Sequence, residues 1–178
     1  MMIEVLDPTY EDDTNSFIYA PRLDNLNSLT VGIISNGKKG TFHFFNTMEN
    51  LLKKKYKVDK VIRVVKKNYS SPAEEKIMKE VQNWDVTIAG VGDWGSCSSC
   101  SLHDSIKSEL LGVPSFGIMT SKFVSAAELM SRAMGAENYP FVTIKHPISS
   151  ATRDRLRIQA ADALQEGINF LLKSRRSN

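Results

Sequence analysis

Residues 86–91 read VTIAGV and residues 29–35 read LTVGIIS, and these are the clearest apolar runs of the chain. Near-continuous runs of Val and Ile indicate strands that are covered on both faces, as the strands of a parallel sheet are. Shorter runs at residues 61–65, 113–119 and 141–144 bring the number of predicted strands to five.

Apolar residues at helical spacing separate these runs, as in repeated strand–helix units. Three such stripes are expected to face the core: Phe42, Phe45, Met48 and Leu52; Leu102, Ile106 and Leu110; and Phe123, Ala127, Met130 and Met134. A further, regular helix is expected from about residue 152 to residue 173. Ser71 and Pro72 predict the start of another helix, because proline is common in a first turn.

This alternation predicts an α/β fold, namely a flavodoxin-like or Rossmann-like three-layer sandwich. Its five-stranded, mostly parallel sheet is expected to have the strand order 2-1-3-4-5. A chain of 178 residues, 42% of them hydrophobic, suffices for one core. We therefore expect a single domain at residues 29–178. Residues 1–28 are expected to form an arm over this domain or over a neighbouring subunit.

The charge distribution argues against a nucleic-acid partner. The net charge of +3 comes from 23 basic and 20 acidic residues, and the basic excess lies in short clusters that solvated surfaces explain. No apolar run approaches the roughly 18 residues of a membrane span. The acidic N-terminal region has no signal-peptide pattern. These features predict a cytoplasmic protein with no membrane partner.

Two loops rich in small and polar residues are expected to form the working site. In such sheets, ligands bind beyond the carboxyl ends of the strands, where the strand order reverses. The sequence SNGKKGT at residues 35–41 follows the first strand, and Asn36 and Lys38 there are candidates for holding an anion. The alternative is a glycine turn with solvated lysines. The loop matches neither a Walker A motif nor the Ser/Thr-rich loop of an FMN-binding flavodoxin.

The loop at residues 93–101 holds the only two cysteines, Cys97 and Cys100, just before a predicted helix. A helix N-terminus stabilises a thiolate and lowers a cysteine pKa, which favours a nucleophile or a reversible dithiol. Alternatively, the two small residues fill a tight turn. A metal held by these cysteines with His103 and Asp104 is a further alternative, but no second ligand pair is found elsewhere and no metal site is predicted.

Two other predicted strand ends add polar side chains to the same edge. Ser121 follows the fourth strand and His146 follows the fifth, and such positions suit substrate anchors and general acids or bases. His103 lies beside the cysteines, whereas His43 lies inside the first helix and is expected to pack or to face solvent.

The chain resembles the UGSC family, bacterial proteins named for a motif of Sec or Cys, Gly, Ser and Cys. The matching residues are Leu6-Asp7-Pro8-Thr9, Ala20-Pro21-Arg22, Asn36-Gly37-Lys38, Ser71-Pro72-Ala73, Gly92-Asp93, Gly95-Ser96-Cys97, His103-Asp104, Phe123 and His146-Pro147. The cysteine loop is also similar to the Sec-containing loop of glycine reductase protein B, which Gly95, Ser96, Cys97 and Cys100 match. The resemblance implies thiol- or selenol-based chemistry on a small molecule.

One position departs from the family pattern, because Trp94 stands where the family has Sec or Cys. Either Cys97 has taken over as nucleophile with Cys100 as its resolving thiol, or the chain is an altered partner or regulatory subunit with Trp94 lining a pocket. The first hypothesis is a thiol-dependent oxidoreductase or lyase. It requires no cofactor beyond a candidate external thiol or electron donor.

The first hypothesis assigns catalytic roles to Cys97, Cys100, His103, Asp104 and His146. It assigns substrate binding to Asn36, Lys38, Asp93, Trp94, Gly95, Ser96 and Ser121. The chain is expected to form a homo- or hetero-oligomer, and an FMN- or nucleotide-binding module is a third, minor alternative.

Overall fold

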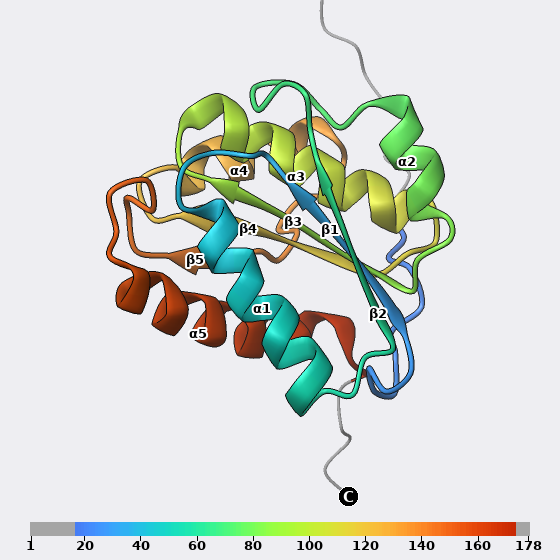
Figure 1. Cartoon of the computed structure of the whole chain (residues 1–178). Coiled ribbons are helices and arrows are strands. Elements are labelled where there is room, and N and C mark those ends of the chain that lie inside the picture. Colours follow the sequence, from blue (N-terminus) through green and yellow to red (C-terminus); the bar gives the residue numbers. More distant parts are fainter. Residues whose placement is uncertain (1–16, 174–178) are drawn as a thin grey trace, which may run out of the picture.

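The computed structural model describes residues 17–173, in which helices alternate with strands (Figure 1). The strands are β1 (Thr30–Ser35), β2 (Lys60–Val65), β3 (Val86–Gly92), β4 (Ser115–Thr120) and β5 (Val142–Ile144). The helices are α1 (Thr41–Lys55), α2 (Glu75–Val81), α3 (Gly95–Leu110), α4 (Val124–Ala133) and α5 (Arg153–Leu171). Within this part of the chain, no helix has both the length and the apolar character needed to cross a bilayer.

The strands form one parallel sheet in the order β2-β1-β3-β4-β5, which confirms the predicted order. Helices α1 and α5 cover one face, and α2, α3 and α4 cover the other, so the fold is the predicted three-layer sandwich (Figure 1). Every residue of β3 is buried, as expected for a central strand. The order reverses between β1 and β3, and a cleft at their carboxyl ends is therefore expected.

Two glycines let bulky rings lie close to the backbone. A Cβ on Gly32 of β1 would stand 1.7 Å from the ring of Trp84, which therefore lies directly on the strand. A Cβ on Gly167 of α5 would stand 2.3 Å from the ring of Phe116 in β4. Any side chain at these positions would displace a buried aromatic ring, so glycine is required there by close approach.

Three local predictions were wrong. Helix α2 begins at Glu75 and not at Ser71, because hydrogen bonds to the backbone of Ser71 and Ala73 hold that segment as a turn. Phe42 and Leu110 were expected in the core, but they are 61% and 54% exposed. Phe44 is the additional buried ring of α1, and Phe42 instead packs against the guanidinium of Arg63.

The described part of the predicted arm lies on its own chain at the amino edge of the sheet. The buried carboxylate of Glu109, near the end of α3, accepts two hydrogen bonds from Arg22 at 3.0 and 2.8 Å and one from the Ala20 N–H at 2.8 Å. Leu23 forms a parallel bridge with Leu172. The rest of the predicted arm, residues 1–16, lies outside the described residues.

Candidate functional site

Cys97 lies inside α3 and not in a loop before it. Helix α3 begins at Gly95, so only Asp93 and Trp94 separate it from β3, and the predicted loop of residues 93–101 is wrong. The early start depends on small side chains: a Cβ on Gly92 would stand 2.4 Å from the hydroxyl of Ser98. The helix therefore lies directly against the end of the strand.

The Cys97 thiol caps the first turn of α3. Its Sγ accepts hydrogen bonds from the backbone N–H groups of Asp93 at 3.3 Å and Trp94 at 3.1 Å, and the thiol donates to the Trp94 carbonyl at 3.2 Å. The side chain is completely buried. This sulfur satisfies backbone groups that a helix start leaves unpaired, and it faces away from solvent.

Cys100 lies one turn further along α3 and is also buried, and neither cysteine is in a disulfide. Burial raises the pKa of the Cys100 thiol, and the nearby Lys66 ammonium lowers that pKa by a smaller amount. The net direction is upward, so Cys100 is mainly a neutral thiol at pH 7.

Lys66 and Asp104 form a buried ion pair that the sequence analysis missed. Lys66 Nζ lies 2.7 Å from Asp104 Oδ2, and both side chains are 1% exposed. Lys66 also donates to the Ser71 carbonyl, and Asp104 accepts the Ala73 N–H, each at 2.8 Å. Asp104 therefore ties the segment after β2 to α3. The signal in the sequence was the position of Lys66 directly after a predicted strand, at the same edge as the cysteines.

His103 lies beside Asp104 on α3. Its Nδ1 lies 3.5 Å from Asp104 Oδ1, yet that nitrogen has no hydrogen-bond partner among the described residues. Its side chain is 29% exposed. Within residues 17–173, no three His, Cys, Asp or Glu side chains converge as a metal set.

Asp93 and His146 form the second buried contact of the site. His146 Nδ1 lies 3.1 Å from Asp93 Oδ1 and 3.1 Å from the Thr120 hydroxyl, so it sits between the ends of β3 and β4. The Asp93 carboxylate also accepts the N–H groups of Ile148 at 3.2 Å and Ser149 at 3.4 Å. Because Asp93 is 1% and His146 27% exposed, the carboxylate is internal and the imidazole reaches the surface.

Trp94 lies at the surface of the site. Its side chain is 61% exposed and stacks on Phe123, with ring centroids 6.3 Å apart. The Lys38 ammonium lies 5.6 Å from the Trp94 ring and 4.9 Å from the Tyr69 ring. A cleft of about 450 Å³ runs between them, and its lining residues are Lys38, Lys39, Tyr69, Trp94, Ser96 and Ser149. Lys39 lies in the predicted loop of residues 35–41 but was not among the predicted binding residues, and Tyr69 and Ser149 belong to no motif that could have indicated them.

Of the other predicted binding residues, Ser96 lines the cleft, whereas Asn36 and Ser121 do not. Asn36 is buried; its amide donates to the Val91 carbonyl and its Oδ1 accepts the Lys38 N–H, so it shapes the loop. Ser96 is exposed and its hydroxyl lies 3.1 Å from that of Ser70. Gly95 begins α3, whereas Ser121 is exposed and does not line the cleft.

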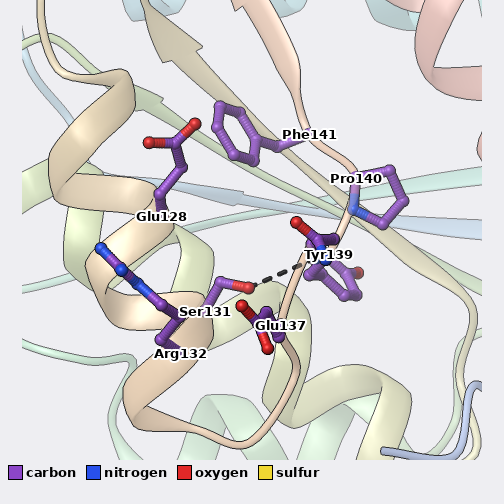
Figure 2. Close-up of a pocket in the computed structure, with 8 residues that line it drawn as sticks. Glu128, Ser131, Arg132, Glu137, Tyr139, Pro140 and Phe141 are labelled. Carbon is purple, nitrogen blue, oxygen red and sulfur yellow. Dashed lines mark hydrogen bonds between the residues drawn. The ribbon is translucent and has the colours of Figure 1, made fainter.

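A second hollow of about 450 Å³ lies at the far end of α4 (Figure 2). The Ser131 hydroxyl accepts the Tyr139 N–H there at 3.3 Å, and the charged lining residues are Glu128, Arg132 and Glu137. It contains none of the predicted site residues, and α4 leads away from the carboxyl end of β4. The candidate site is therefore the Trp94 cleft.

Fold and site together define a parallel α/β protein with a basic, aromatic-lined cleft at the carboxyl edge of its sheet, beside the point where strand order reverses. The UGSC family model matches residues 4–173, and the chain belongs to the UGSC family. No curated protein matches the chain.

Proposed function

We propose that this chain binds a small, planar, anionic molecule in the Trp94 cleft, and that the first position of the family motif here binds a ligand instead of reacting with it. The observation that carries the proposal is the difference in solvent exposure between Trp94 and Cys97, which lie three residues apart. The Trp94 side chain is 61% exposed beside the cleft, whereas the Cys97 side chain is completely buried.

The charge and shape of the cleft support an anionic, planar ligand. Two ammonium groups, those of Lys38 and Lys39, line it, and among residues 17–173 no carboxylate does. The rings of Trp94 and Tyr69 flank the Lys38 ammonium, which gives one planar face and one cation close together. A planar acid can stack on the indole while its carboxylate pairs with Lys38.

Asp93 is the positioning residue of this proposal, whereas in the thiol-dependent alternative the imidazole that it holds, that of His146, would be the proton-transfer group. A carboxylate bound to Nδ1 orients the ring and favours the tautomer with the proton on that nitrogen, which leaves Nε2 free to accept a proton. Ser149, held by Asp93 through its backbone N–H, lines the cleft. The same carboxylate therefore positions both the imidazole and one wall of the cleft.

Tryptophan fluorescence tests the proposal directly. Trp94 is exposed and Trp84 is 5% exposed, so a ligand in the cleft should quench the Trp94 emission selectively. We expect saturable quenching by benzoate or nicotinate, and at least tenfold weaker quenching by benzamide or nicotinamide, which lack the charge. Lys38→Met should weaken benzoate binding about fivefold, equivalent to about 1 kcal/mol.

Lys122→Met is the matched control, because Lys122 is exposed and does not line the cleft. Equal quenching by acids and amides, or no saturation with any of them, would contradict the proposal.

A second candidate function is the thiol-dependent enzyme, and one observation favours it. Two backbone N–H groups point at Cys97 Sγ, an arrangement that stabilises a sulfur anion. In this proposal Cys97 is the nucleophile, Cys100 the resolving thiol, and an external thiol restores the enzyme. Iodoacetamide labelling of the native protein, read by peptide mass, tests it. Fast labelling of Cys97 well below pH 8.5, the approximate pKa of an ordinary cysteine, would support it, and an inert Cys97 would contradict it.

The partner-subunit hypothesis rests, like the first proposal, on the presence of Trp94 where the family has Sec or Cys. Size-exclusion chromatography with light scattering tests the predicted oligomer. A cytoplasmic location likewise stays a prediction of the sequence.

A further inference from the structure

A third hollow, of about 550 Å³, lies beside the Trp94 cleft, between the start of α1, the strand β2 and the start of α5. Its basic lining residues are Lys38, Lys39, Arg63 and Arg153, and no Asp or Glu of the described part of the chain lines it. We propose that this basic cavity binds a phosphate group, carried by a small organic phosphate ester. This phosphate site is distinct from the ligand site proposed in the neighbouring Trp94 cleft.

Arg63 lines the cavity, and a neighbouring carboxylate offsets its charge only in part. One guanidinium nitrogen donates to the Asn46 side chain and another to the Phe42 carbonyl, which are both neutral acceptors. The carboxylate of Glu49 is 3.9 Å away and already accepts a 2.7 Å hydrogen bond from Lys53. Its side chain is 20% exposed, so much of the charge lies in a region of reduced dielectric.

The other cations complete the positive lining. Lys39 and Arg153 form no ion pair with any residue of the described chain, 17–173. Cations gathered around a cavity without an acidic residue repel one another, and an anion of matching charge relieves that repulsion. A phosphate dianion does so better than a single carboxylate, and its oxygens match the planar fork of a guanidinium.

The wall of the cavity is built by a closely packed loop. Gly40 has a φ of +95°, and a Cβ there would stand 2.6 Å from the carbonyl oxygen of Ile148. The loop after β1 therefore lies against the segment that precedes α5. This contact brings the loop that contains Lys38 and Lys39 close to the segment that leads to Arg153, and all three residues line the cavity. The cations thus come from three separate parts of the chain.

The cavity and the cleft share Lys38, Lys39 and Ser149. One phosphate ester with a planar group would therefore reach both spaces, with its phosphate in the cavity and its planar group against Trp94. This joint occupancy rests on the proposed function of the cleft, whereas the phosphate site does not.

Titration of the full chain with inorganic phosphate, followed by the amide NMR resonances of Gly40 and Thr41, tests the proposal at constant ionic strength. We expect saturable shifts with phosphate and none with an equal concentration of acetate. Arg153→Gln should weaken phosphate binding at least threefold, and Lys39→Gln/Arg153→Gln at least tenfold. The control is Arg157→Gln, because Arg157 is a turn further along α5, is 71% exposed and pairs with Asp154 at 3.5 Å.

Two outcomes would overturn the phosphate site: shifts that phosphate and acetate cause equally, or Arg157→Gln weakening phosphate binding as much as Arg153→Gln. Trp94→Ala separates the two proposals when both ligands are followed by amide NMR, because it should weaken benzoate binding and leave the phosphate-dependent shifts of Gly40 and Thr41 unchanged. If the wild-type chain bound phosphate but not benzoate, the proposed ligand of the cleft would be refuted and the phosphate site would stand.

Discussion

His146 Nδ1 lies 3.1 Å from Asp93 Oδ1, and the same carboxylate accepts the backbone N–H groups of Ile148 and Ser149. One buried acid at the end of β3 therefore holds the whole segment that follows β5. The segment borders both the Trp94 cleft and the basic cavity through Ser149.

Asp93→Asn should lower the free energy of unfolding by about 2–4 kcal/mol, because an amide removes the buried charge that three donors surround and adds donor hydrogens among them. Urea unfolding measures this change. Asp24→Asn is the control, since Asp24 pairs with Lys173 on the surface and should cost less than about 1 kcal/mol. If both variants lowered the free energy of unfolding equally, Asp93 would stabilise the carboxyl edge of the sheet no more than a surface carboxylate does.

Substitutions of Cys97 separate a helix cap from a nucleophile. Serine retains an oxygen that accepts backbone N–H groups, so Cys97→Ser should keep the fold and the benzoate-dependent quenching. Cys97→Ala should lose a further ~1 kcal/mol of stability, because it leaves the Asp93 and Trp94 N–H groups unpaired. Thermal unfolding and fluorescence titration give both readouts. If serine abolished a measured turnover while the fold stayed intact, the thiol would be chemically required.

Alkylation of Cys100 should depend steeply on pH. Burial holds the pKa of its thiol above the ordinary value, so the reactive thiolate forms only as the pH rises past that of a free cysteine. We expect negligible iodoacetamide labelling of Cys100 at pH 7 and an increasing rate above about pH 9. A short, unstructured peptide with one cysteine is the control and should label at lower pH. A Cys100 rate equal to that of the peptide would contradict the buried, neutral thiol.

The Lys66–Asp104 pair predicts a strong coupling between two substitutions. Lys66→Met leaves a carboxylate buried without its cation and should destabilise the chain by about 3–5 kcal/mol. Adding Asp104→Leu removes that uncompensated charge and should recover at least about 1 kcal/mol, despite the lost acceptor of the Ala73 N–H. Chemical unfolding of the single and double variants measures the coupling. Additive losses would show that the two side chains do not depend on each other.

Much of the architecture was readable from local patterns. The apolar runs identified the five strands, and the alternation with helices predicted their order. Errors occurred where packing overrides the local signal. Pro72 suggested a helix start, but the contacts of Lys66 and Asp104 with that segment delay the helix to Glu75. Phe42 fits a helical stripe, yet it lies on the first turn of α1 at the rim and is exposed.

The candidate site was predicted as a region, and its internal arrangement was not. Cys97, Trp94 and His146 do lie at the same edge of the sheet, because the carboxyl ends of parallel strands share one edge. Lys66, Tyr69 and Ser149 belong to no recognisable motif, and their contribution arises from segments that meet only in three dimensions. Asn36, for which binding was predicted, and Asp104, for which catalysis was predicted, make internal hydrogen bonds that the sequence does not reveal.

The sequence by itself determined the layered α/β fold, the strand order and the edge at which the polar residues gather, because hydrophobic periodicity and strand–helix alternation are local properties. The family was indicated separately, by a resemblance in short motifs such as Gly95-Ser96-Cys97. Only the tertiary structure decided which side chains of the motif face solvent. Each residue of an α-helix turns the side-chain direction by about 100°, so the start of α3 at Gly95 sets where Cys97 points. That start depends on the close packing of Ser98 against Gly92, which turns the thiol inward and leaves the indole of Trp94 at the surface.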